Sequence, residues 1–193
     1  MRLAEVERGD SPMHRLLIRG ISRLAGYRLP DAARVAFYDR GFAGPVLGRW
    51  TQKAMRGPSP WSVSERELMA AMVASWNACP FCVGAHRAIS VRGMEPAVVD
   101  AVLADFRSAP IDERLRAVLA FLETMTKDPD GLSAADARAA LDAGVTVAEL
   151  EDAAAVAAVF AVITRNANAL DFALPTAEEF DRAAGMLLRR GYS

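Results

Sequence analysis

Residues 64–86 read SERELMAAMVASWNACPFCVGAH and contain both cysteines of the chain. Just before this stretch begins, Ser62 pairs with Glu65 in a capping-box pattern, which predicts the start of a helix. Pro80 is unfavourable inside a helix but favourable at its first position. We therefore predict one helix that ends just before Cys79 and a second helix that begins beside it.

The turn between these two helices decides whether Glu67 can meet His86. On one unbroken helix, which rises 1.5 Å per residue, the two residues would lie about 28 Å apart. If the chain instead turns back at residues 77–80, the helices run antiparallel and Glu67 falls beside residues 86–89. We predict this turn, and with it a carboxylate next to an imidazole.

Cys79, Cys82 and His86 share one face of the second helix, because they are spaced by three and then four residues. Alpha carbons three residues apart in a helix lie about 5 Å apart, a separation that a disulfide tolerates. A thiol near helix N-terminal amides and an imidazole ionises more readily than a free cysteine, and the thiolate is the nucleophile. We predict that His86 accepts the proton of Cys82 and that Glu67 orients the imidazole.

Other interpretations of these residues stay open. The two cysteines and the nearby histidine supply three possible zinc ligands, and His14 or a carboxylate would have to be the fourth. The cysteines could also be buried structural residues, which are common in protein cores. Glu67 could instead cap its own helix together with Ser64.

Helical periodicity dominates the rest of the chain, and no segment has the alternation and turn chemistry of a strand. We predict an all-α fold of about eight helices in one domain, residues 1–193, with an N-terminal helix within residues 1–28. Three further capping boxes begin at Ser133, Thr146 and Thr176 and mark the starts of later helices.

Apolar positions indicate where the core lies. The Ala- and Val-rich segment 153–169 has almost no polar face, which predicts a buried central helix or a subunit contact. Asn166 and Asn168 are expected to end that helix. Trp76 and Phe81 are typical core residues, although both could shape an apolar mouth for an organic substrate.

Composition argues against several classes of partner. The net charge of −1 leaves no basic surface for nucleic acid. Acidic residues near the N-terminus argue against a signal peptide, and the longest apolar run, residues 153–163, is shorter than the about 20 residues of a membrane span. We expect a cytoplasmic protein without a membrane partner, where closely spaced cysteines are redox-active or metal-binding. The hydrophobic fraction of 52% favours a homo-oligomer.

The stretch 64–86 resembles the core of the alkylhydroperoxidase D-like branch of the carboxymuconolactone decarboxylase-like superfamily. That branch has a glutamate twelve residues before the first cysteine, followed by C-x-x-C-x-x-x-H. The matching residues in this chain are Glu67, Cys79, Cys82 and His86. The similarity extends over about residues 41–175 and is most specific in the motif itself.

The resemblance implies an all-α fold, trimers or hexamers of identical subunits, and a cofactor-free peroxidase or disulfide oxidoreductase. It also implies that Cys82 attacks the peroxide and that Cys79 resolves the product. The best-studied members carry a histidine between the cysteines where this chain has Phe81, so a weaker activity or another substrate is expected. The decarboxylase branch lacks the cysteine pair, and decarboxylation is therefore not expected.

These patterns together predict a thiol peroxidase that reduces organic hydroperoxides with neither a metal nor a cofactor. A dithiol reductant, such as a lipoyl or thioredoxin-like protein, would restore the thiols. Two alternatives remain. One is a disulfide-exchange adaptor in which Cys79 meets a partner protein, and the other is a non-enzymatic oligomeric binding protein that uses the fold and not the thiols.

Overall fold

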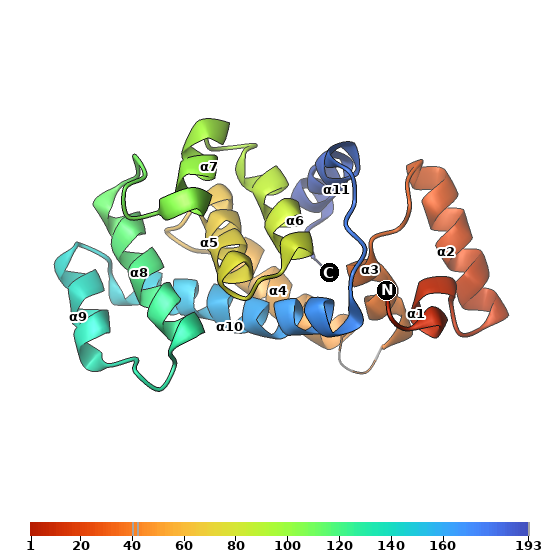
Figure 1. Ribbon diagram of the computed structural model, residues 1–193, viewed down its shortest axis with the longest axis horizontal. Coiled ribbons are helices and arrows are strands. Elements are labelled where there is room, and N and C mark those ends of the chain that lie inside the picture. The colour runs from red at the N-terminus through yellow and green to blue at the C-terminus, as the bar shows by residue number, and fades with distance from the viewer. Residues whose placement is uncertain (40, 42, 193) are drawn as a thin grey trace.

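The computed structural model describes residues 1–39, 41 and 43–192, and within them it contains eleven α-helices and no strand. The helices are α1 Ala4–Arg8, α2 Pro12–Ala25, α3 Asp31–Tyr38, α4 Pro45–Arg56, α5 Val63–Trp76, α6 Pro80–Ser90, α7 Pro96–Asp105, α8 Glu113–Lys127, α9 Ala134–Asp142, α10 Val147–Leu170 and α11 Ala177–Arg190 (Figure 1). The all-α prediction is confirmed, and the expected number of about eight helices was too low.

The first four helices lie between residues 4 and 56. α1 has five residues and no side-chain cap, so no sequence signal marks it. α4 begins at Pro45, whose fixed φ favours the first turn of a helix and whose missing N–H costs little there. The N-terminal helix predicted within residues 1–28 corresponds to α2, which Ser11 caps and which ends at Gly26 in a left-handed conformation.

A hairpin of α5 and α6 lies at the centre of the fold. The capping box of Ser62 and Glu65 begins α5, and the helix ends at Asn77, as predicted. Ala78 then adopts a left-handed φ of 49°, and Cys79 caps the next helix. Every residue of α5 from 66 to 74 is buried, so α5 is enclosed on all sides by other helices.

The long helix α10 crosses beneath this hairpin and contacts α4, α5 and α8 (Figure 1). The predicted buried central helix is therefore confirmed, and its inward face contributes Ala153, Val156 and Phe160 to the main core. Asn168 does not end it. The helix continues to Leu170, and Asp171 closes it with a left-handed φ of 55°.

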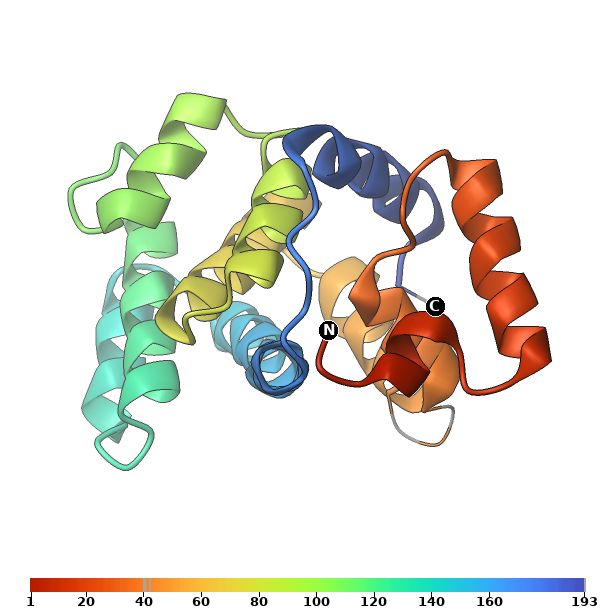
Figure 2. The same ribbon diagram turned by 45° about the vertical axis from the view of Figure 1, so that its right-hand side comes forward.

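The N-terminal helices form an arm that lies beside the C-terminal helix α11 (Figure 2). Figure 2 shows α1, α2 and α3 together at one end of the molecule, with α11 between this arm and α6. The apolar residues Met13, Leu16 and Leu24 of α2 are exposed.

In the described part of the chain, no helix is both long and apolar enough to cross a membrane.

Candidate functional site

The hairpin brings Glu67 of α5 against His86 of α6. Glu67 Oε2 lies 2.6 Å from His86 Nδ1, and both side chains are buried. The antiparallel turn that the sequence predicts is thus present, and it produces the predicted contact. The alternative capping role of Glu67 with Ser64 was wrong, because Glu65 closes the capping box and leaves Glu67 free to point inward.

Glu67 is an ionised acceptor in this pair. Burial alone would raise the pKa of Glu67, but the charge and hydrogen bond of His86 and the guanidinium of Arg56 outweigh it, and the pKa is lowered. A carboxylate only accepts hydrogen bonds, so His86 Nδ1 carries the proton. The other ring nitrogen, Nε2, has no hydrogen-bond partner among the described residues, and His86 lines a cavity.

Cys79 is the N-cap of α6, and Cys82 lies in its first turn, as Pro80 predicts. Both thiols are free, and each cysteine is only 1% exposed. A hydrogen bond from the Cys82 thiol lowers the pKa of Cys79 to about 7; burial opposes this shift, and the N–H groups of Cys82 and Phe81 add to it. Cys79 is therefore the more readily ionised thiol of the pair.

Cys82 is the donor in this pair. Its pKa is raised, first by the hydrogen bond to Cys79, then by burial and by the neighbouring charge. No hydrogen bond between Cys82 and His86 forms within the described residues, although both line the same cavity. Proton transfer from Cys82 to His86 stays a prediction, since contacts between a nucleophile and its base are often longer before a substrate binds.

That cavity has a volume of about 500 Å³, and its walls are mainly apolar. Side chains of α3, α4, α6, α10 and α11 line it, among them Val35, Leu47, Phe160, Ile163, Phe180 and Leu187. A cavity of this size and character is typical of a binding site for a small organic molecule. Cys82 and His86 are the chemically reactive residues on its wall.

Cys79 opens on a different and smaller cleft, of about 290 Å³. Ala78 and Asp171 border this cleft, and they are the two non-glycine residues with positive φ in the described chain. Phe81 and Phe172 line both spaces, with their rings edge to face at a centroid distance of 5.1 Å. This aromatic pair lies between the cleft of Cys79 and the cavity of Cys82.

The structure distinguishes the two aromatic residues that flank the motif. Phe81 takes part in the wall of the cavity, in keeping with an apolar mouth. Trp76 packs edge to face on Phe106, at a centroid distance of 6.0 Å, and does not line either space. Trp76 is therefore a core residue.

Two partners of Glu67 carry no signal in the sequence. Arg56 Nη2 lies 2.7 Å from Glu67 Oε1 and forms an ion pair with it. The hydroxyl of Tyr192 donates to the same carboxylate, at 2.9 Å from Oε1. Because Tyr192 is 125 residues from Glu67 in the sequence, no local pattern relates them.

The zinc interpretation finds no ligand set in residues 1–39, 41 and 43–192, where no three His, Cys, Asp or Glu side chains converge. His14, which was the possible fourth ligand, is paired with Asp10 in the N-terminal arm. It is partly exposed there.

Comparison with solved structures identifies the fold. The chain resembles a peroxidase-related protein from Silicibacter sp. TM1040 with a TM-score of 0.76 and 22% identity, over 93% of each chain. It resembles a peroxidase-related protein with an alkylhydroperoxidase AhpD core from Ralstonia eutropha JMP134 with a TM-score of 0.73 and 26% identity, over 93% of this chain and 94% of that one. It also resembles a variant of the debrominase Bmp8 in complex with 2,3,4-tribromopyrrole, with a TM-score of 0.70 and 19% identity, over 93% and 92%.

No protein-family model matches the chain, and no curated protein matches its sequence. The structural likeness nevertheless includes more of the chain than the predicted segment of about 41–175. The resemblance to alkylhydroperoxidase D-like proteins is confirmed, and the fold is theirs. Similar folds support different reactions, since the neighbours include peroxidase-related proteins and a debrominase.

Proposed function

We propose that this protein is a thiol-dependent peroxidase that reduces apolar organic hydroperoxides. One observation carries the proposal: Cys82 and a histidine held by a buried carboxylate line the same apolar cavity, and a second cysteine stands three residues earlier, at the N-cap of the same helix. A nucleophile, a base and an orienting group are the parts that nucleophilic catalysis requires.

In the first step, His86 Nε2 accepts the proton of Cys82 and the thiolate attacks the outer oxygen of the hydroperoxide. The S–O bond forms as the O–O bond breaks, and the departing alkoxide takes the proton from His86. The products are an alcohol and a sulfenic acid on Cys82. Cys82 is assigned this role because it lines the larger cavity, although Cys79 is the more acidic thiol.

In the second step, the Cys79 thiolate attacks the sulfur of the sulfenic acid. The S–S bond forms as the S–O bond breaks, and hydroxide leaves and takes up a proton from solvent to become water. The backbone N–H groups of Cys82 and Phe81, which also lower the pKa of Cys79, remain in place after Cys82 is oxidised and favour the thiolate of Cys79. The position of both cysteines at the start of α6 supports a disulfide between them, since alpha carbons three residues apart in a helix lie about 5 Å apart.

A dithiol then reduces the disulfide. Its thiolate attacks Cys79 from the smaller cleft, and its own disulfide is the oxidised product. The Phe81–Phe172 pair supports a separate route for each reactant, because it lies between the cleft and the cavity. We propose a lipoyl or thioredoxin-like protein as the physiological dithiol, and a cytoplasmic location, where thiols stay reduced.

The proposal includes a homo-oligomer, a trimer or a hexamer. The exposed apolar residues of α2 support it: Met13 is 71% exposed, Leu16 68% and Leu24 92%. A row of this kind on a helix that packs little against its own chain is typical of a subunit contact. Light scattering after size-exclusion chromatography measures the subunit number, and a monomer at micromolar concentration would contradict this part of the proposal.

The central experiment measures cumene hydroperoxide reduction with dihydrolipoamide as the electron donor. We expect turnover by the parent protein and none by Cys82→Ser. In Cys79→Ser, cumene hydroperoxide should leave a sulfenic acid on Cys82, which dimedone traps and mass spectrometry locates. A sulfenic acid on Cys79 in the Cys82→Ser variant, with none on Cys82 in the Cys79→Ser variant, would reverse the assigned roles.

Reductive debromination is a second candidate reaction, because the fold is shared with Bmp8 and the cavity is lined by aromatic side chains. The same assay with 2,3,4-tribromopyrrole in place of the hydroperoxide separates the two. Bromide release without peroxide turnover would favour debromination. Exchange with a disulfide partner but no turnover of either oxidant would favour the adaptor, and no thiol reactivity at all would favour a binding protein.

A further inference from the structure

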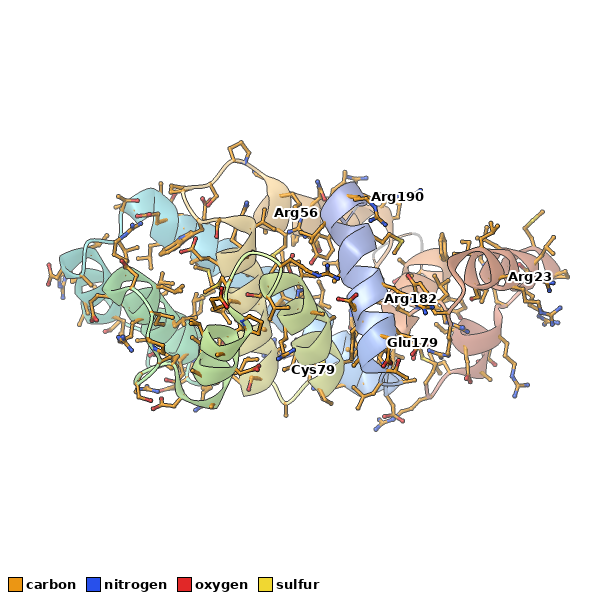
Figure 3. The ribbon with its side chains drawn as sticks, turned by 90° about the horizontal axis from the view of Figure 1, so that it is seen from above. Arg23, Arg56, Cys79, Glu179, Arg182 and Arg190 are labelled. Carbon is orange, nitrogen blue, oxygen red and sulfur yellow. The ribbon has the colours of Figure 1, made fainter. Side chains whose placement is uncertain are left out.

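The segment after α11 returns to the relay of Glu67 and His86. Figure 3 shows Arg190 at the end of α11 on the side of Arg56, with Glu179 at the opposite end of the helix. Beyond Arg190, the Tyr192 hydroxyl lies 2.9 Å from Oε1 and 3.1 Å from Oε2 of Glu67. An aromatic residue from the far end of the chain thus contacts the carboxylate that holds the histidine.

The position of Tyr192 is determined by several contacts at once. Its backbone N–H donates to Gln52 Oε1 of α4 at 2.7 Å. Its ring lies nearly parallel to that of His86, at an angle of 27° and a centroid distance of 6.4 Å, and the Arg56 guanidinium lies 4.9 Å from its centre. Gly191 permits this approach, because its φ is 71° and a Cβ there would lie 2.2 Å from Gln52 Oε1.

Arg56 and Tyr192 act differently on Glu67. Arg56 supplies positive charge to a carboxylate that is fully buried, which offsets the cost of removing that charge from water. His86 and Tyr192 each hydrogen-bond to the carboxylate and bring no positive charge of a guanidinium to it. Burial and the adjacent carboxylate raise the pKa of Tyr192 well above its ordinary value, so the hydroxyl stays a neutral donor.

We propose that Tyr192 is a positioning residue of the relay, an inference that rests on the proposed peroxidase function. Its hydroxyl fixes the rotation of the Glu67 carboxylate so that Oε2 faces His86 Nδ1, and its ring covers the pair from solvent. His86 is thereby held with Nε2 toward the cavity. Tyr192 also lines the cavity, but its hydroxyl is bonded to Glu67, so its effect on the chemistry passes through Glu67.

The test uses Tyr192→Phe, which removes the hydroxyl and keeps the ring. We expect kcat/KM for cumene hydroperoxide to fall about tenfold, the lower end of the effect seen when an orienting partner is removed. Loss of a donor makes Glu67 more basic, so the acid limb of the pH profile should move to higher pH. Tyr38→Phe is the matched control, because Tyr38 is 43% exposed and does not line the cavity.

A spectroscopic measurement tests the positioning without turnover. The Nδ1 proton of His86 should give a strongly deshielded NMR signal while it is bonded to Glu67, and the chain has only one other histidine. We expect the signal to broaden or move in Tyr192→Phe and to persist in Tyr38→Phe. If the parent protein reduces no hydroperoxide, the proposed function fails, yet this signal still decides whether Tyr192 positions the relay.

Two further variants keep the inference open to refutation. In Glu67→Gln, adding Tyr192→Phe should have little further effect on kcat/KM, because Tyr192 acts through Glu67. Gln52→Ala, which releases the backbone of Tyr192 and leaves its side chain intact, should show a smaller loss in the same direction and provides a second route if Tyr192→Phe folds poorly. An unchanged pH profile and an unchanged Nδ1 signal in well-folded Tyr192→Phe would overturn the proposal.

Discussion

His86 Nδ1 lies 2.6 Å from Glu67 Oε2, although 19 residues and a change of helix separate the two in the sequence. The contact depends on the turn at 77–80, which Asn168 of α10 secures by donating to the carbonyl of Asn77 at 2.8 Å. A buried carboxylate such as Glu67 is costly to leave without its partners, because its charge has no water around it. The turn between α5 and α6 therefore determines whether His86 Nδ1 keeps its bond to Glu67.

Glu67→Gln should lower kcat/KM for cumene hydroperoxide by about 10²-fold, since the neutral amide no longer holds the Nδ1 proton of His86. The substitution also removes the negative charge that pairs with Arg56, which lowers the stability of the fold. Turnover is therefore to be measured per folded molecule. Glu65→Gln is the control on the same helix. Glutamine also closes a capping box, so stability and turnover should stay unchanged, and equal losses in both variants would contradict the relay.

The acidity of Cys79 should depend on its neighbour. Alkylation by iodoacetamide requires the thiolate, so its rate at Cys79 should rise as the pH climbs through about 7 and level off above it. Cys82→Ala removes the main hydrogen bond that lowers this pKa and should move the midpoint to higher pH, whereas Cys82→Ser keeps a donor. Mass spectrometry of the alkylated peptide gives the rate, and a parent midpoint near the ordinary value of about 8.5 would refute the thiol pair.

Filling the larger cavity should lower the activity toward bulky oxidants and leave the activity toward small oxidants unchanged. Ala36 of α3 lines the cavity, and Ala36→Phe should lower kcat/KM for cumene hydroperoxide at least about tenfold, because misfit of even a small group in such a pocket has an effect of that size. Hydrogen peroxide should be unaffected. Ala139→Phe, at an exposed position of α9, is the control, and an equal loss for both oxidants would argue against this cavity as the substrate site.

Gly84 of α6 faces the ring of Phe180 in α11. A Cβ at this position would lie 2.5 Å from Phe180 Cε2, so Gly84→Ala should lower the free energy of unfolding by about 1–3 kcal/mol. At Gly20 of α2, a Cβ would have no neighbouring atom within 4 Å, and Gly20→Ala should raise stability by about 0.5–1 kcal/mol. Urea unfolding measures both, and a stabilising Gly84→Ala would show that the two helices are less tightly packed.

Local patterns were sufficient for much of the site. The capping box at Ser62, the proline after Cys79 and the spacing to His86 correctly predict two antiparallel helices and the contact with Glu67. These signals act over a few residues, through backbone hydrogen bonds and the fixed φ of proline. The same kind of signal was too weak for α1, which lacks a cap, and the number of helices was underestimated.

The sequence by itself thus determined the helices α5 and α6 and the turn that brings Glu67 to His86. Only the tertiary structure decided that the two cysteines open on separate spaces, that Cys79 is the more acidic thiol, and that Tyr192 reaches Glu67. The physical reason is the range of the interactions. Helix ends depend on neighbours within one or two turns, whereas cavities, burial and contacts over 125 residues depend on how whole helices pack, which periodicity does not specify.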